Sequence, residues 1–211
     1  MRDCCFCAEN FRFREADASG AFEIPSRILF ENENWYLVPT LGCFTTGYVL
    51  LISKKHVFSV ANLDCDSFRE MLAIKARVEE FLAEHCGMKC LCFEHGVTSD
   101  SCDGPNSVNH LHLHIAPFHR PIWRDMALDG FQSVARYEDL LSIWAADLPD
   151  AYLIFQDVDG KIYYHGNASG FPSQFFRMRI APYYGASEWN WKRNDYGDNI
   201  LNSIALFKSF K

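Results

Sequence analysis

The first 117 residues alternate between short apolar runs and polar turns, a pattern that predicts a β-sheet. Residues 64–86 instead place apolar side chains at helical spacing, with Asp64 or Asp66 as the helix cap and Gly87 as its end. We therefore expect a sheet covered by one long helix. The apolar runs expected to form strands lie at 24–30, 35–38, 48–53 and 89–93.

A further strand is predicted at 108–117, and it carries three histidines. Alternate side chains of a strand share a face, so His110, His112 and His114 would form one row, with apolar side chains anchoring the other face. Packing alone rarely explains three histidines in register, so we interpret the row as functional. A loop of about 11 residues lets this strand pair antiparallel with 89–93, which would bring Glu94 and His95 near the row.

The second half of the chain has a different pattern. Residues 118–131 are irregular and aromatic, and residues 136–148 and 199–210 can form helices. Apolar runs at 152–155 and 162–164 flank the turn sequence 157–160, which is a strong hairpin signal. We find no repeat, low-complexity tract or flexible linker, so we expect the second half to pack on the first.

Composition and charge exclude several classes of protein. The 211 residues are 49% hydrophobic and carry a net charge of −7, which argues against a general nucleic-acid binder but leaves small anionic ligands open. No apolar run approaches the ~18–20 residues of a membrane span. The N-terminus lacks the apolar core of a signal peptide, and nine cysteines, an odd number, do not suit a disulfide framework. We expect a cytoplasmic protein with metal-bound or buried thiols.

Cys4 and Cys7 have the Cys-x-x-Cys spacing at which two thiolates can hold one tetrahedral zinc ion. Two further ligands would be needed, and His56, after the strand 48–53, is a candidate. The alternatives are buried thiols or a redox pair, although a redox pair normally lies between a strand and a helix.

Three histidines in a row suggest phosphoryl or acyl chemistry, because a neutral imidazole is nucleophilic near pH 7. The central His112 is the candidate nucleophile and His114 would bind the phosphate being transferred. His110 could aid phosphate binding or ligate a metal ion. A catalytic zinc ion held by all three is disfavoured, since they would span ~13 Å along the strand.

The C-terminal half contains one candidate anion site. Ser173 follows Pro172 and can cap a helix, and Gln174, Arg177 and Arg179 follow it. A helix N-terminus with arginines nearby can hold a phosphate. The alternative is a capped surface helix with solvated arginines.

The sequence resembles the histidine-triad (HIT) family, whose motif is His-φ-His-φ-His-φ-φ with φ apolar. Residues 110–116 match every position of this motif. The segments 3–7, 24–31 and 52–56 and the Ser-Val pair at 107–108 also resemble the family, so the resemblance covers about residues 3–117. It implies an α+β fold with an antiparallel sheet and flanking helices over residues 1–120. Residues 121–211 would then be a C-terminal α/β extension.

The resemblance also implies roles for individual residues. His112 would be the nucleophile that forms a nucleotidyl-histidine, and His114 would position the α-phosphate. Ser107 would contact the phosphate or the leaving group, as would Asn106, which stands where many members have glutamine. A structural zinc site would be formed by Cys4, Cys7, His56 and His110.

Two positions depart from the family pattern. Thr40 stands where many members have an acidic or amide residue that binds the ribose. Glu94 stands where an amide is usual, and its carboxylate would repel a phosphate unless protonated or paired, with His95 as one partner. Glu94 could instead face the ribose or base.

The segment containing Ser173, Gln174 and Arg177 resembles the tail of a longer bacterial group of this family.

We therefore expect a nucleotide hydrolase or nucleotidyltransferase acting at the α-phosphate of a dinucleoside polyphosphate or nucleoside phosphoramidate. The leaving group would take a proton near His114 and Ser107. The alternatives are a nucleotide-binding protein without turnover and a zinc-dependent hydrolase. Family members are often dimers, so the resemblance implies a homodimer. Neither a membrane nor polymeric nucleic acid is expected as a partner.

Overall fold

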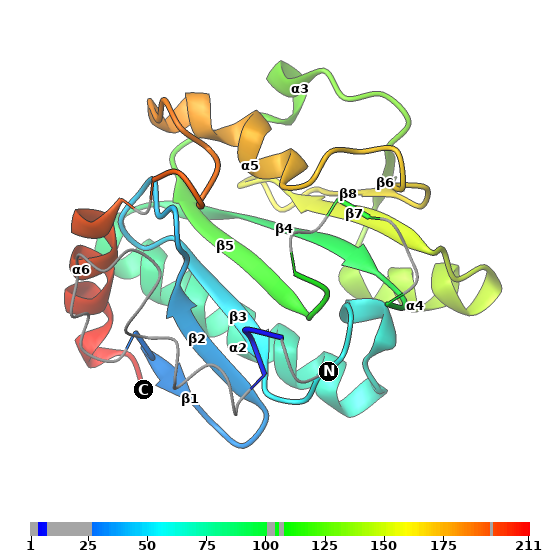
Figure 1. Cartoon of the computed structure of the whole chain (residues 1–211), viewed down its shortest axis with the longest axis horizontal. Helices are drawn as coiled ribbons and strands as arrows, with labels where there is room; N and C mark the ends of the chain where they lie inside the picture. The colour runs from blue at the N-terminus through cyan, green and yellow to red at the C-terminus, as the bar shows by residue number, and fades with distance from the viewer. Residues whose placement is uncertain (1–3, 8–26, 101–103, 106–107, 195) are drawn as a thin grey trace.

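The structure is a computed structural model that describes residues 4–7, 27–100, 104–105, 108–194 and 196–211 (Figure 1). Its centre is an eight-stranded sheet with the strand order β1-β2-β3-β5-β4-β7-β8-β6, and every pair of neighbours is antiparallel. The predicted α+β fold with an antiparallel sheet is thereby confirmed. The strands are β1 (Phe30–Glu31), β2 (Trp35–Pro39), β3 (Val49–Ser53), β4 (Lys89–Val97), β5 (His112–Phe118), β6 (Gln132–Val134), β7 (Ala151–Gln156) and β8 (Ile162–His165).

The long predicted helix is α2 (Cys65–Cys86). The side chain of Asp64 accepts a hydrogen bond from the backbone N–H of Ser67 at 2.8 Å, and Gly87 ends the helix with a φ of +65°. Its apolar stripe packs against one face of the sheet, where α4 (Tyr137–Ala146) also lies. The N-cap, the apolar stripe and the C-terminal end of α2 are those that the sequence predicts.

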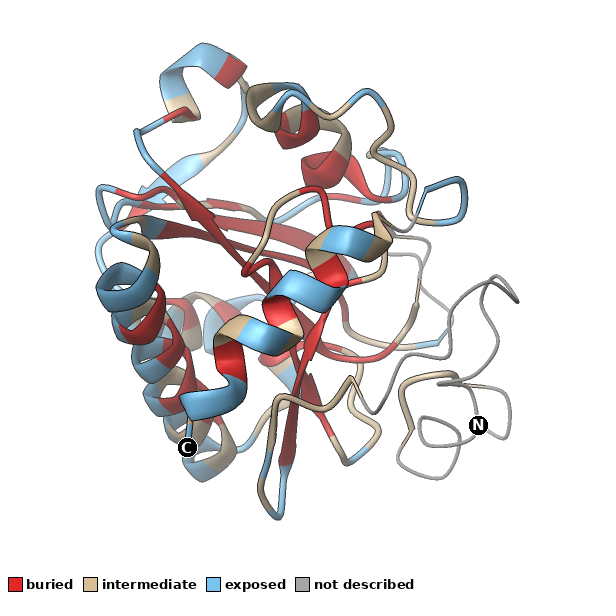
Figure 2. Ribbon diagram, turned by 90° about the vertical axis from the view of Figure 1, so that its left-hand side faces the viewer, coloured by how far each residue is buried: buried red, intermediate tan, exposed pale blue. Residues whose placement is uncertain are grey.

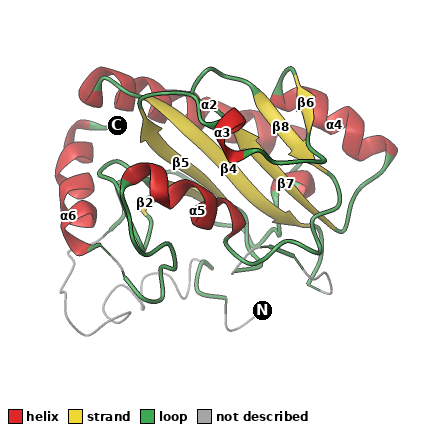
Figure 3. Cartoon of the chain, turned by 90° about the horizontal axis from the view of Figure 1, so that it is seen from above, coloured by secondary structure: helices red, strands yellow, loops and turns green. Residues whose placement is uncertain are grey.

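The other face of the sheet is covered by α3 (Trp123–Met126) and α5 (Phe175–Ile180) (Figures 1 and 3). Because side chains alternate along each strand, the two faces form separate apolar clusters. Figure 2 shows that the central strands are buried between these layers. The histidine row therefore lies on the α5 face and the leucines between the histidines on the α2 face.

The C-terminal half joins the N-terminal half through the sheet itself. β4 pairs with β5 on one side and with β7 on the other, with Phe93 opposite Phe155. The predicted hairpin is β7–β8, which turns at Gly160 with a φ of +85°. Since both sides of β4 are occupied, a dimer that extended this sheet would have to use β1 or β6. A homodimer stays a prediction.

The remaining described elements are short or C-terminal. Helix α6 (Gly197–Leu206) packs its buried Ile200 in the cluster on the α5 face, and it continues into η3 (Phe207–Ser209). The other 3₁₀ turns are η1 (Val60–Asn62) and η2 (Ala181–Tyr184). Within the described ranges, no helix is both long and apolar enough to cross a membrane.

Candidate active site and metal centre

β5 carries two of the three histidines. His112 stands opposite Ile52 of β3, and His114 stands between Leu50 of β3 and Phe93 of β4. His110 precedes the strand, where the backbone N–H of Leu111 donates to the carbonyl of Val57 at 2.8 Å. The row expected from the alternation is therefore divided, because its first histidine leaves the strand ladder.

The hydrogen bond of His112 determines which of its two ring nitrogens carries the hydrogen of the neutral imidazole. Its Nδ1 lies 2.6 Å from the carbonyl oxygen of His110, which can only accept, so Nδ1 carries the hydrogen and Nε2 keeps a lone pair. Burial lowers the pKa of His112, the His110 carbonyl raises it to a smaller extent, and the charge of Arg177 lowers it. His112 is therefore neutral at pH 7 and has the electronic state of a nucleophile.

His114 lies beside His112, with ring centroids 5.1 Å apart. Its ring stacks on Phe93 at 4.3 Å, and its Nδ1 lies 2.8 Å from the hydroxyl of Tyr48. Burial holds the pKa of His114 well below its usual value, and His112, His95 and Arg177 lower it further. The two strand histidines thus form a buried pair of neutral imidazoles.

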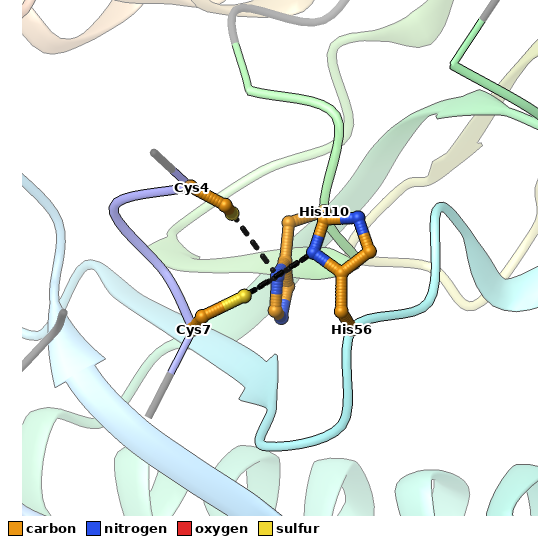
Figure 4. Close-up of side chains that lie close together, drawn as sticks. All are labelled: Cys4, Cys7, His56 and His110. Atoms are coloured by element: carbon orange, nitrogen blue, oxygen red, sulfur yellow. Dashed lines mark hydrogen bonds between the residues drawn. The ribbon is translucent and has the colours of Figure 1, made fainter. Parts of the chain in front are cut away.

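Four potential metal ligands, among them the first histidine of the row, lie close together (Figure 4). The ligand atoms of Cys4, Cys7, His56 and His110 all lie within 4.8 Å of one another. The two histidine Nδ1 atoms are 3.2 Å apart, and each is 3.3–3.4 Å from a cysteine sulfur. A tetrahedral zinc ion with ordinary Zn–N and Zn–S lengths would separate such atoms by about 3.3–3.6 Å. The donor set and its spacing are compatible with zinc.

The hydrogen bonds of His110 favour the same interpretation. Its Nε2 donates to the carbonyl of Ser53 at 2.7 Å, so the Nδ1 lone pair faces the cluster. Burial lowers the pKa of His110 to about 4, which keeps that nitrogen unprotonated. Burial and the neighbouring Cys4 raise the pKa of Cys7 to about 11, so a thiolate there requires a nearby cation.

His95 also lies on the triad face. Its Nε2 accepts a hydrogen bond from the backbone N–H of Phe176 at 3.0 Å, and its ring centroid lies 5.9 Å from that of His114. Burial lowers the pKa of His95 to about 3, with a further contribution from His112. His95 therefore joins β4 to the start of α5 directly beside His114.

The expectation that Glu94 reaches the substrate or pairs with His95 is wrong. Successive strand residues point to opposite faces, so Glu94 lies on the α2 face. There its carboxyl accepts from the backbone N–H of Val60 at 2.8 Å and from the hydroxyl of Tyr152 at 2.7 Å. Burial raises the pKa of Glu94 to about 7. This carboxyl anchors η1 to the sheet.

The start of α5 also differs from the prediction. The helix begins at Phe175, and its N-cap is Gln174 in the left-handed region with a φ of +61°, so Ser173 is not the cap. The backbone N–H of Gln174 donates to Pro105 at 2.7 Å, and its side-chain amide donates to Asn190 at 3.3 Å. The first bond holds the start of α5 against the loop that precedes the triad, and the second links it to the segment that follows the helix.

Arg177 of α5 is buried against the triad face and does not lie on an open helix surface. Its guanidinium reaches Tyr48 and, at 3.5 Å, the hydroxyl of Thr40. Thr40 in turn donates to the carbonyl of Leu41 at 2.9 Å. The hydroxyl expected to bind a ribose is thus already engaged within the protein. Asn106 and Ser107 lie outside the described residues.

Sequence reasoning did not identify Tyr48 as part of the site. The signal was its position immediately before β3, where it continues the alternation of Leu50 and Ile52 that faces the histidines. The hydroxyl of Tyr48 connects Arg177 with His114, residues that are far apart in the sequence.

Part of the chain is similar to known proteins. Residues 21–120 match the HIT domain family. A hypothetical histidine triad nucleotide-binding protein from Sulfolobus tokodaii strain7 is 21% identical, with a TM-score of 0.42 over 56% of this chain and 70% of that one. A Zn-bound histidine triad family protein from Mycobacterium smegmatis is 22% identical, with a TM-score of 0.40 over 56% and 76% of the two chains.

A member of the HIT family from Bacillus subtilis is 20% identical, with a TM-score of 0.41 over 68% of this chain and 94% of that one. No curated protein sequence matches the chain. The histidine motif and the family match coincide within residues 21–120. This segment, residues 21–120, is therefore a HIT domain.

Proposed function

We propose that this protein is a nucleotide hydrolase or nucleotidyltransferase that acts at the α-phosphate of a nucleotide through a nucleotidyl-His112 intermediate. The observation that carries the proposal is the 2.6 Å bond from Nδ1 of His112 to the His110 carbonyl. That bond directs the unprotonated Nε2 away from the backbone, and burial keeps the ring neutral. Dinucleoside polyphosphates and nucleoside phosphoramidates are the substrate classes that fit this chemistry.

In the first step, Nε2 of His112 attacks the α-phosphorus, a P–N bond forms, and the bond to the leaving group breaks. The His110 carbonyl stabilises the positive charge that the His112 ring then acquires. A phosphate leaving group departs as an anion, and an amine leaving group takes a proton from solvent. His114 and Ser107 hold the phosphate oxygens in this scheme.

In the second step, an acceptor hydroxyl attacks the same phosphorus. The P–N bond breaks, His112 returns to its neutral form, and the proton of the acceptor passes to solvent. Water as the acceptor gives hydrolysis, whereas another hydroxyl held by the C-terminal half gives transfer.

The Cys4, Cys7, His56 and His110 cluster has a structural role in this proposal. Zinc bound there would supply positive charge and a fixed attachment of the N-terminal segment to the start of β5. Four protein ligands complete a tetrahedral site and leave no position for substrate, which favours a structural over a catalytic metal. His112 and His114 are outside this ligand set.

A second candidate is a nucleotide-binding protein that does not turn over its ligand. The engagement of the Thr40 hydroxyl with Leu41 and Arg177 favours it, because this hydroxyl could only accept a bond from a ribose and would orient a substrate less firmly for attack.

Mass spectrometry after incubation with a panel of nucleotides separates the two candidates. We expect a nucleotide adduct on His112 and its loss, together with turnover, in His112→Ala. His119→Ala, an exposed histidine just beyond the same strand, is the matched control and should behave like the wild type. Retained turnover in His112→Ala would exclude His112 as the nucleophile. Nucleotide binding by calorimetry without any adduct or turnover would favour the second candidate.

A further inference from the structure

Arg177 is a buried cation whose hydrogen-bond partners, within the part of the chain that the structure describes, are all neutral. It is 2% exposed, and its guanidinium donates to the carbonyls of Gly42 at 2.7 Å and Trp189 at 3.2 Å. The same group donates to the hydroxyls of Tyr48 at 3.2 Å and Thr40 at 3.5 Å. Among the described residues, no carboxylate forms an ion pair with it. Burying an uncompensated charge is costly, so this arginine requires an explanation beyond packing.

The surroundings of Arg177 hold its guanidinium in one place. The guanidinium carbon lies 5.2 Å from the ring centroid of Phe44 and 5.4 Å from that of Tyr48, distances typical of cation–π contact. Gly42 has a φ of +67°, and a Cβ built there would overlap Nη2 of Arg177. The loop after β2 is thus shaped to receive this side chain from α5.

The bond between Tyr48 and His114 has a direction that follows from Arg177. A guanidinium can only donate, so the phenol oxygen of Tyr48 accepts from it. Burial raises the pKa of Tyr48, so the phenol keeps its own hydrogen. The acceptor in reach is Nδ1 of His114 at 2.8 Å, since within the described residues no other acceptor faces this hydroxyl. An unsatisfied buried hydroxyl would be unfavourable, so Nδ1 of His114 is the acceptor and its proton resides on Nε2.

We infer that Arg177 is a positioning residue which acts through Tyr48 to hold His114 with its proton on Nε2, ready to donate to an anionic oxygen of the substrate phosphate. This inference rests on the proposed function and adds to it a role for the C-terminal half. No described residue bonds to Nε2 of His114, which leaves that donor for a ligand. The buried His95 and His114 are neutral, so the guanidinium of Arg177 is also a fixed positive charge on the face that would bind the phosphate.

The tautomer is tested directly by long-range ¹H–¹⁵N NMR of histidine-labelled protein without substrate. We expect His114 of the wild type to be the Nε2–H tautomer, and Tyr48→Phe to contain a substantial fraction of Nδ1–H. Tyr48→Phe keeps the ring and removes only the hydroxyl, so it should preserve the fold. An Nδ1–H tautomer in the wild type, or an unchanged tautomer in Tyr48→Phe, would overturn the inference.

The kinetic consequence is measured as the rate of adduct formation on His112 with a nucleoside phosphoramidate. We expect Tyr48→Phe and Arg177→Met to slow this step by about 10- to 100-fold, as loss of a supporting hydrogen bond commonly does. Arg177→Lys should recover part of the loss, because it restores the charge. The control is Arg69→Gln on α2, since Arg69 is an exposed arginine that pairs only with Asp66 in the salt bridges of the described residues, and it should react like the wild type.

The two parts of the experiment separate the inference from the proposed function. A wild type that forms no adduct contradicts the proposed function, while the NMR result still decides the tautomer. Conversely, a wild type that forms the adduct at a rate unaffected by Tyr48→Phe supports the proposed function and excludes the positioning role. Circular dichroism and thermal unfolding of each variant show whether a loss of rate reflects a loss of fold.

Discussion

Replacing Glu94 with glutamine should change how the stability of this protein depends on pH. Burial raises the pKa of the Glu94 carboxyl to about 7, against 4.5 for an ordinary glutamate, although its bonds to Val60 and Tyr152 act in the opposite direction. A carboxyl whose pKa is raised on folding makes its full contribution to the free energy of unfolding below about pH 4.5, where it is protonated in both states. Between pH 4.5 and 7 the unfolded chain releases this proton and the folded chain keeps it, so the stability falls.

The magnitude follows from the difference in pKa between the two states. A difference of about 2.5 at 1.36 kcal/mol per unit amounts to about 3 kcal/mol lost between pH 4.5 and 8. Glutamine does not titrate and can keep one hydrogen bond to Val60 and one to Tyr152. The free energy of unfolding of Glu94→Gln, relative to wild type, should therefore rise by about 3 kcal/mol over this range.

Urea unfolding at a series of pH values, with zinc held constant, measures this difference. With an m-value of about 2–3 kcal/mol/M, the urea concentration at the unfolding midpoint of Glu94→Gln, relative to that of the wild type, should rise by about 1–1.5 M between pH 4.5 and 8. Glu80→Gln, on the exposed side of α2, is the control and should track the wild type. Parallel pH profiles for the wild type and Glu94→Gln would refute the reasoning, because they would mean that the carboxyl is ionised in the fold.

Two further predictions concern the metal centre and the core. Elemental analysis should find about one zinc ion per chain in the wild type and in His112→Ala, and much less in Cys7→Ser, which should also melt at a lower temperature. Cys65→Ser, an exposed cysteine, should keep the metal, and equal zinc in Cys7→Ser would contradict the proposed ligand set. Leu113→Ala removes a core side chain that is 1% exposed between the two strand histidines, and should cost about 2–5 kcal/mol in chemical denaturation, whereas Leu148→Ala, 49% exposed, should change stability little.

Much of the fold and half of the site could be predicted from local patterns. Apolar spacing of 3.6 residues predicts α2, and alternation predicts β2, β3, β5 and the hairpin β7–β8, because each pattern matches the period of its element. The Cys-x-x-Cys pair and the resemblance to the family together indicated four ligands, and these do converge. Such features are encoded within short segments, so a sequence alone reveals them.

Other features required tertiary structure because they depend on which distant segments meet. The pairing of β4 with β7 and the register with β5 decide that His95 faces the triad and Glu94 faces α2. Helix α5 begins after Ser173, later than predicted, because Gln174 adopts a left-handed backbone that lets its N–H reach the carbonyl of Pro105. Neither fact is marked by the residues themselves.

The amino-acid sequence by itself determined the histidine row, the Cys-x-x-Cys pair and the resemblance to the HIT family, because each depends on short motifs with a fixed spacing. Only the tertiary structure decided that Arg177 is linked to His114, since three of its four hydrogen-bond partners, among them Tyr48, come from segments more than 100 residues earlier. The physical reason is that a buried charge is tolerated only where the whole fold supplies its hydrogen bonds, and such an environment leaves no local pattern in the chain.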